Sequence, residues 1–330
     1  NRMTQLENAM RMGLTRIELL VGASLAVLAV GLVLPRVQAA RADAARVQCK
    51  ENLRILGQGF LGYEKAKGGF APRRSGFNDG NPYAGWGVHI LPYINEPELA
   101  KKYNFKLDCF DPGNKAVVET QIAAFKCPAS PAKRTTPIQS QASAKSENPD
   151  KDTPFKVEGG VNDYISSNGV LFPRNGYALN ANELDQMLGN QRQPTTDNVD
   201  VPLVRITDGL SCTVLLIEQA GRPDTWRAGK KQNAEGAQFG MAANARGMWA
   251  GWGSIAFGPS GADGGPAKGD AADCSVNCSN VFGIYSFHDA GAHILLCDGA
   301  VRFVGKKFDP LTFMYLTIRD DGHLLAPNDF

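Results

Sequence analysis

The sequence has no strong excess of charge of either sign. Its 35 lysine and arginine residues are nearly balanced by 33 aspartate and glutamate residues, which leaves a formal net charge of +2 over 330 residues. Proteins that bind nucleic acid through phosphate contacts carry a basic surplus or a basic stripe. The composition therefore gives no reason to expect nucleic acid as a partner.

Motifs of the common enzyme classes are also missing. The chain contains no phosphate-cradling loop, no nucleophile elbow, no zincin motif and no Cys-x-x-Cys. No internal repeat is visible. The 36 glycines and 19 prolines exceed average usage only moderately, which predicts many turns rather than a disordered chain.

One long apolar run is present near the start of the chain. Residues 19–34 contain no charged side chain, and Leu14, Ile17 and Val37 extend the apolar character on either side. About 20 apolar residues are enough for a helix to span a bilayer. Glu18 stands at the edge of the run, where an ionised carboxylate costs about 2.5 kcal/mol or more unless a partner neutralises it. The run predicts a membrane helix, and Glu18 predicts a partner for that helix.

This stretch resembles the class III signal of type IV prepilins and type II secretion pseudopilins. Gly13 matches the residue before the cut, Leu14 the first mature residue, and Glu18 the glutamate at the fifth mature position. Pro35 matches a helix-kinking proline common in type IV pilins, whereas Leu14 replaces the usual Phe and Arg16 an apolar residue. The resemblance implies cleavage by a prepilin peptidase, methylation of the new Leu14 amine, and assembly with other pilin-like subunits through the N-terminal helix.

An ordinary secretory signal peptide is the alternative for this stretch. Its basic region would contain Arg2, Arg11 and Arg16, and its cut would fall near residues 37–39. Two features argue against a signal peptide. Glu18 lies at the start of the apolar run, and the run is longer than the 7 to 15 apolar residues of a cleaved signal. Both interpretations export most of the chain. Basic residues flank the run on both sides, so the N-terminus-inside orientation is implied by the resemblance alone.

The helix is predicted to continue beyond Pro35. Apolar residues recur at steps of three and four between residues 45 and 63, and Lys67-Gly68-Gly69 predicts a stop. Glycines inside this stretch each cost about 1 kcal/mol relative to alanine, so either the helix ends early or its backbone packs closely there. We therefore expect a leader at 1–13, a transmembrane helix at 14–35, an amphipathic continuation at 36–68 and an exported domain at 69–330.

The exported region predicts short strands, turns and long loops. Strands are expected near residues 122–127, 164–172 and 212–217. Residues 292–304 predict a hairpin whose two-residue turn is Asp298-Gly299, with positive φ at both positions. Asp309-Pro310 predicts the start of a helix that ends near residue 318. The fold expected is α+β and type IV pilin-like, with a long N-terminal helix packed on an antiparallel sheet.

Further motifs follow one another along the exported region. Nine residues separate His288 from Asp298-Gly299, and the other motifs are Gly85-Trp86, Leu91-Pro92-Tyr93, Phe125-Lys126-Cys127-Pro128, Ile206-Thr207-Asp208-Gly209, Glu218 and Asn277-Cys278. In this order they resemble the large planctomycete-type family of pilin-like proteins defined by a domain of unknown function, DUF1559. The resemblance implies a class of protein without implying an activity.

A catalytic site is the competing interpretation of His288. A hydrolase would use His288, Asp289 and His293 together with Asp208 or Glu218. The spacing of the histidines matches no helical ligand pair, and strand alternation would place them on opposite faces. We expect His288 to satisfy backbone groups beside the hairpin. No catalytic residue, cofactor or metal ion is predicted.

Seven cysteines in an exported chain predict disulfides, and the odd number leaves at least one cysteine unpaired. The favoured pairs are Cys109 with Cys127, which flank one loop, and Cys274 with Cys278, which are close in sequence. Cys49 lies on the apolar stripe of the helix, where it fits core packing as well as a bridge.

Four tryptophans, Trp86, Trp226, Trp249 and Trp252, lie in glycine-rich surroundings. They can form a ligand surface for glycan or cell wall, or they can anchor the core beneath long loops. The function predicted is a non-catalytic subunit of a type IV pilus or type II secretion-type filament, or an anchored relative, in the cytoplasmic membrane with its C-terminal domain outside. The alternative is a membrane-anchored glycan- or cell-wall-binding module.

Overall fold

The computed structural model describes residues 16–77, 79–138, 157–170, 192–232, 247–251, 253–265, 274–323, 325 and 330, without the side chains of residues 26–30, 137, 138, 255 and 256. Its contacts divide the chain into two compact units, Asn1–Ala45 and Arg46–Phe330. The predicted leader and the cleavage residues Gly13 and Leu14 lie outside the described residues.

One long helix, α2, spans Arg16–Lys67 and contains Pro35 in its interior. Five apolar residues of its second half are buried at steps of three and four; they are Cys49, Leu53, Leu56, Phe60 and Tyr63. This spacing places them on one face of a helix. The helix ends at Lys67, and Gly68 follows with a φ of 86°, a left-handed conformation that glycine adopts without strain. The kink expected at Pro35 stays a prediction.

In the part of the chain that the structure describes, no helix combines the length and the apolar character needed to cross a membrane.

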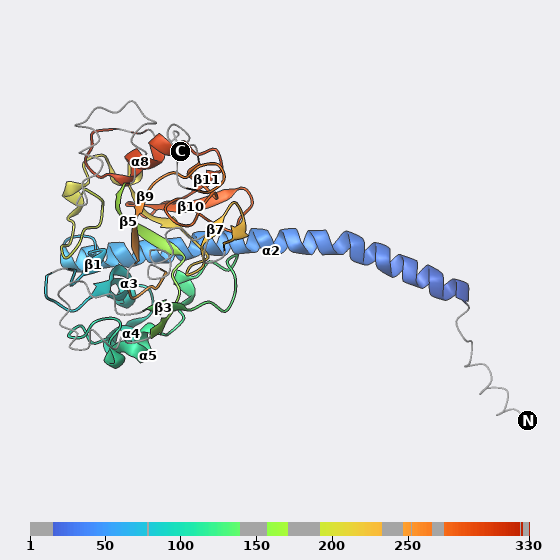
Figure 1. Ribbon diagram of the computed structural model, residues 1–330, viewed down its shortest axis with the longest axis horizontal. Helices are drawn as coiled ribbons and strands as arrows, with labels where there is room; N and C mark the ends of the chain where they lie inside the picture. The colour runs from blue at the N-terminus through green and yellow to red at the C-terminus, as the bar shows by residue number, and fades with distance from the viewer. Residues whose placement is uncertain are drawn as a thin grey trace, which may run out of the picture. The chain divides into compact units, whose positions relative to one another are not determined.

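The second unit is built around a five-stranded sheet with the strand order β11-β10-β6-β5-β9 (Figure 1). Its strands are β5 (Tyr164–Val170), β6 (Val214–Glu218), β9 (Ser254–Phe257), β10 (Gly291–Leu296) and β11 (Val301–Gly305). Neighbouring strands are antiparallel except β5 and β9, which run parallel. The predicted α+β class is confirmed, with one parallel pair in an otherwise antiparallel sheet.

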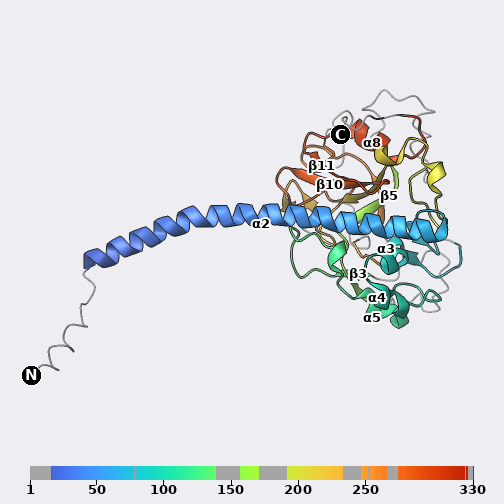
Figure 2. The ribbon, with the colours of Figure 1, turned by 180° about the vertical axis from the view of Figure 1, so that it is seen from behind.

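The two faces of the sheet are buried in different layers (Figures 1 and 2). One face shares a core with the second half of α2; its residues include Tyr164, Leu216 and Leu295, which cluster with Leu53 and Leu56. The other face is covered by α8 (Pro310–Thr317); its residues include Ile165, Ile217 and Ile294, which cluster with Phe313 and Leu316. Successive side chains of a strand point to opposite faces, so residues 294 and 295 belong to different cores.

Short elements fill the rest of the second unit. They are β1 (Arg74–Ser75), β2 (Ala84–Gly85), α3 (Trp86–Ile90), η2 (Leu91–Tyr93), α4 (Pro97–Lys102), η3 (Pro112–Asn114), α5 (Lys115–Val118), η4 (Ala123–Phe125), β3 (Thr136–Ile138), β4 (Val157–Gly159), η5 (Leu203–Arg205), η6 (Leu210–Cys212), β7 (Trp226–Arg227) and β8 (Lys230–Lys231). The strand predicted at 122–127 is wrong. This segment forms the 3₁₀ turn η4, because Phe125 N donates to Ile122 O within the segment at 3.2 Å.

The hairpin of β10 and β11 is present, but its turn differs from the prediction. Leu296 N donates to Ala300 O and Gly299 N donates to Leu296 O, which encloses a three-residue loop. Gly299 has a φ of 88°, whereas Asp298 is not at positive φ and accepts from Ala300 N through Oδ1 at 2.8 Å. The predicted two-residue turn is therefore wrong. The predicted helix start is confirmed, since Asp309 caps α8 by accepting from Thr312 N at 2.6 Å.

Candidate functional site

Glu218 is the last residue of β6, and its side chain is fully buried. Its Oε2 accepts a hydrogen bond from His293 N at 2.6 Å and lies 3.0 Å from His293 Nδ1. His293 belongs to β10, which pairs with β6 so that Ile294 lies beside Ile217. The next step of this antiparallel register brings Glu218 and His293 together, although the two residues are 75 positions apart in the sequence.

His288 approaches the other oxygen of the same carboxylate. Its Nε2 lies 3.6 Å from Glu218 Oε1 and 3.7 Å from Cys127 Sγ. The rings of His288 and His293 stand nearly perpendicular, with centroids 5.7 Å apart. Two imidazoles and one cysteine sulfur thus surround a single buried carboxylate.

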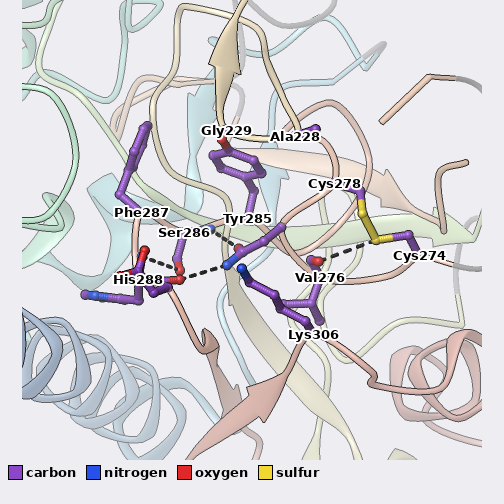
Figure 3. A pocket seen from close by; sticks show the side chains of 12 residues that line it. Ala228, Gly229, Cys274, Val276, Cys278, Tyr285, Ser286, Phe287, His288 and Lys306 are labelled. Carbon is purple, nitrogen blue, oxygen red and sulfur yellow. Dashed lines mark hydrogen bonds between the residues drawn. A yellow bond between two sulfur atoms is a disulfide. The ribbon is translucent and has the colours of Figure 1, made fainter. Parts of the chain in front are cut away.

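A polar network fixes the backbone around His288. Asn277 Nδ2 donates to His288 O at 2.9 Å, and Asn277 Oδ1 accepts from Ser286 N at 2.8 Å. Ser286 Oγ accepts from His288 N at 3.1 Å, and Figure 3 shows these two residues side by side. Asn277 and His288 come from separate motifs of the DUF1559 resemblance, and the structure places them in direct contact.

Cys127 is joined to Cys49 of α2 by a disulfide with a Cα–Cα distance of 5.2 Å. The predicted bridge between Cys109 and Cys127 is wrong, and Cys109 is a buried free thiol. Closeness along the sequence suggested Cys109 as the partner of Cys127. The observed partner is Cys49, which lies 78 residues earlier and is brought to Cys127 by α2. Cys274 and Cys278 form the other disulfide, as their spacing predicted.

A buried ion pair supports Cys127. Asp163 Oδ2 accepts from Cys127 N at 2.9 Å and from Arg134 Nη2 at 2.7 Å, while Oδ1 accepts from Arg134 Nη1 at 2.9 Å and Gly221 N at 3.0 Å. The Asp163 side chain is completely buried. These charge-assisted bonds satisfy both carboxylate oxygens and offset the cost of burying the charges. They also fix the position of the Cys127 backbone.

A cavity of about 560 Å³ opens beside the cluster. Its lining includes His288, Tyr285, Lys306 and the disulfide of Cys274 and Cys278 (Figure 3). His288 therefore lines the cavity and also contacts the buried carboxylate. This one imidazole connects the cavity with the cluster behind it.

The charge state of Glu218 follows from its surroundings. Burial raises the pKa of the Glu218 carboxyl, but contacts with His288 and His293 outweigh burial, and the resulting pKa lies below its ordinary value. Among the described residues, Glu218 Oε1 has no hydrogen-bond partner. Buried carboxylate oxygens are costly to leave without one, so this atom is available to a further ligand.

Four buried residues of the cluster have the chemistry of metal ligands. Cys49, Cys127, Glu218 and His288 each place one ligand atom within 4.8 Å of the others. Thiolate, imidazole and carboxylate groups are the ligands that Zn²⁺ takes in proteins. In the disulfide form of the chain the two sulfurs are bonded to each other.

The expectations for the two histidines are wrong. His288 contacts Glu218 and Cys127 through its ring, rather than only backbone groups. His288 precedes β10, so strand alternation does not separate it from His293. The wider hydrolase set is not brought together, because Asp289 is exposed and Asp208 instead accepts from the backbone N–H groups of residues 321 and 322.

The tryptophans divide between core and partly buried positions. Trp86 and Trp249 are fully buried, and both rings pack against Phe125. Trp226 is half-buried against Phe287, with ring centroids 4.9 Å apart. Trp252 lies outside the described residues. Of the two alternatives for the tryptophans, core anchoring is the one observed for Trp86 and Trp249.

The fold and the cluster define an α+β protein in which a sheet, a helix and a loop meet around a buried carboxylate. A family model described as "Protein of unknown function (DUF1559)" matches residues 38–311. The chain belongs to this family, as its motifs predicted. No curated protein and no solved structure matches the chain.

Sequence reasoning did not identify Asp163 and Arg134, and it left the role of Cys49 open. A buried ion pair between residues 29 positions apart has no periodic pattern by which it could be found. Cys49 had a usable signal. A cysteine on the buried face of a helix points into the core, so any disulfide partner of Cys49 would be another core cysteine.

Proposed function

We propose that the protein is a pilin-like, non-catalytic structural subunit of a type IV pilus or type II secretion-type filament, or a membrane-anchored relative of such a subunit. It is a single-pass protein of the cytoplasmic membrane with its C-terminal domain outside. A prepilin peptidase cuts it between Gly13 and Leu14. Its other partners are pilin-like subunits, which it contacts through the N-terminal helix.

This proposal rests on the difference in exposure of apolar side chains between the first and the second part of α2. Large apolar side chains are exposed in its first part, including Leu19 (61%), Leu20 (65%) and Leu32 (73%). Full burial of a leucine is worth about 1.5–3 kcal/mol, so lipid or neighbouring helices are the favourable surroundings for this part. In the second part, the apolar stripe from Cys49 to Tyr63 is already buried within its own unit. One half of the helix therefore needs partners that the other half does not.

Glu18 supports assembly rather than simple anchoring. A carboxylate beside an uncharged run is unfavourable in lipid unless a positive group neutralises it. Cleavage after Gly13 creates such a group, the Leu14 amine of a neighbouring subunit. Pairing of the two charges selects one register between adjacent helices. The pair is worth more than a solvent-exposed bridge, because removal of one partner leaves the other charge in a poor solvent.

The test is Glu18→Ala in cells that make the protein. Export and the melting curve of the exported domain are expected to match the wild type, because Glu18 lies outside the second unit. The amount in the sheared filament fraction is expected to fall at least about tenfold, the change that about 1.4 kcal/mol produces. Wild-type incorporation of the variant would contradict the assembly role and favour the anchored binding module.

Gly13→Val provides the processing control. Mass spectrometry of the mature protein is expected to find a methylated Leu14 at the N-terminus of the wild type and of Glu18→Ala. The valine variant should retain its leader, because only a minimal side chain is expected to fit the peptidase before the cut. Normal maturation of Gly13→Val would remove the main support for the class III signal.

A further inference from the structure

The cluster around Glu218 has the composition of a tetrahedral metal site, and its His288 separations also fit one. Its four ligand atoms come from Cys49, Cys127, His288 and Glu218, and all four residues are buried. Ligands at zinc–ligand distances of 2.0–2.3 Å in a tetrahedron stand about 3.5 Å apart for sulfur and nitrogen, and about 3.4 Å apart for nitrogen and oxygen. The observed separations are 3.7 Å from Cys127 Sγ to His288 Nε2 and 3.6 Å from His288 Nε2 to Glu218 Oε1.

A second observation points to a ligand at the same place. Glu218 Oε2 is held by His293, but Oε1, fully buried, has no hydrogen-bond partner among the described residues and faces His288 Nε2. Carboxylate ligands of metals are commonly oriented by a hydrogen bond to their second oxygen. His293 supplies that bond here. The oxygen without such a bond, Oε1, is the one that lies 3.6 Å from the ring nitrogen of His288, another residue of the cluster.

We propose that the reduced form of the chain binds one Zn²⁺ ion through Cys49, Cys127, His288 and Glu218, and that the disulfide is the metal-free, oxidised state of the same site. The proposal is independent of the filament function. Reduction lets the two sulfurs separate to the roughly 3.8 Å that two thiolates on one zinc require. Cys127 keeps its backbone position during this change, because its N–H is bonded to Asp163 Oδ2.

The two states are linked by thiol–disulfide exchange. A dithiol reductant transfers two electrons and two protons to the disulfide, becomes a disulfide itself, and leaves two thiols at Cys49 and Cys127. Zinc then displaces both thiol protons, which go to solvent, and binds two thiolates, one neutral imidazole and one carboxylate. The cavity beside His288 gives the ion a path to one of its four ligands.

The experiment compares metal binding by two preparations of the full chain in detergent. The oxidised protein is purified in air. The reduced protein is unfolded and refolded with a phosphine reductant, and it is accepted when a thiol assay finds all seven cysteines free. Co²⁺ serves as the spectroscopic probe, since it reports tetrahedral geometry and thiolate ligation, and Zn²⁺ is then used to displace it.

Reduced wild type is expected to bind one Co²⁺ with thiolate charge-transfer and tetrahedral bands, and the oxidised protein is expected to show neither. His288→Gln removes a ligand at the cavity wall and should weaken binding at least about 100-fold. His293→Gln keeps all four ligands and should weaken binding about 10- to 100-fold through the orientation of Glu218. Asp289→Asn is the matched control, an exposed neighbour of His288 outside the cluster, and should bind like wild type.

Three results would overturn the proposal. The first is the absence of thiolate bands in the reduced wild type. The second is equal binding by the oxidised and reduced proteins, which would place the metal elsewhere. The third is wild-type affinity in the folded His288→Gln variant, which would assign the bands to other cysteines. Far-ultraviolet circular dichroism of each preparation verifies that the protein compared is folded.

Discussion

Single polar residues in the interior of this protein are held by several groups at once. Glu218 contacts two imidazoles, and Asp163 accepts from an arginine and two backbone N–H groups. An unpaired buried charge costs several kcal/mol, so such partners are needed for the fold to be stable. His89 has different surroundings. Its contacts include Ser75 Oγ at 3.0 Å and the rings of Tyr63 and Phe105, none of which is a carboxylate.

The surroundings of His89 predict a loss of stability in mild acid. Burial, with a smaller contribution from the positive charge of Lys67, lowers the pKa of His89 to about 4. An unfolded histidine titrates near pH 6.5, so between these values the unfolded chain binds a proton that the folded chain does not. The stabilisation is fully present above pH 6.5 and is lost as pH falls toward 4. Because His89 is only partly buried, we expect less than the full effect of this pKa shift. The expected loss in the free energy of unfolding is about 2 kcal/mol.

Urea unfolding at pH 7 and pH 4 measures this effect. His89→Gln keeps a hydrogen-bonding side chain beside Ser75 but cannot titrate. Between pH 7 and pH 4 the variant should lose about 2 kcal/mol less of its free energy of unfolding than the wild type does. Equal pH dependence in the variant and the wild type would show that other groups account for the acid sensitivity.

At the scale of elements, the close packing of α2 explains why it contains three glycines, residues of low helix propensity. The helix passes through Gly57, Gly59 and Gly62 without ending. A Cβ at Gly59 would lie 2.4 Å from Ile94 Cγ2, and one at Gly57 would lie 2.9 Å from a Leu295 methyl. The glycines allow the helix backbone to approach the sheet and the segment after α3. Of the two possibilities left open by the sequence, close packing is the one observed.

Gly59→Ala is therefore expected to destabilise the protein although alanine is the better helix former. The propensity gain of about 1 kcal/mol is outweighed by overpacking against Ile94 and Ile90, which typically costs about 1–3 kcal/mol. Gly22→Ala is the control in the same helix, because a Cβ there meets no described atom within 4 Å. Thermal unfolding of the second unit should shift downward for Gly59→Ala and stay unchanged for Gly22→Ala. A gain in stability at Gly59 would contradict the close packing.

At the scale of the whole molecule, one disulfide joins parts that are far apart in the sequence. Cys49 and Cys127 are 78 residues apart and connect the second half of α2 with the segment after η4. Cys274 and Cys278 are only 4 residues apart and tie a loop to itself. A cross-link that closes a longer loop removes more conformational freedom from the unfolded chain.

Replacing each pair by serines should separate these two contributions. The loop-closure model gives a loss of about 4.5 kcal/mol for Cys49→Ser with Cys127→Ser, against about 2 kcal/mol for Cys274→Ser with Cys278→Ser. Denaturant unfolding in the presence of a chelator measures both without a contribution from bound metal. Equal losses would mean that the longer bridge does not restrain the unfolded chain as this model requires.

The sequence by itself determined the features that depend on neighbouring residues. The buried stripe of α2, its end before Gly68, the cap at Asp309 and the family of the chain were all predicted. A helix stripe follows from a period of 3.6 residues, and a cap follows from one side chain that reaches a backbone N–H group three positions away. Such patterns are complete within a few turns of chain.

The tertiary structure alone decided which distant residues meet. The partner of Cys127 comes from α2, and the two histidines reach one carboxylate because β6 lies between β5 and β10 in the sheet. Strand order and register are set by burial of both sheet faces against α2 and α8, and no local spacing encodes them. The local hairpin turn was also mispredicted, since Asp-Gly fits both a two-residue turn and the three-residue loop that the paired strands require.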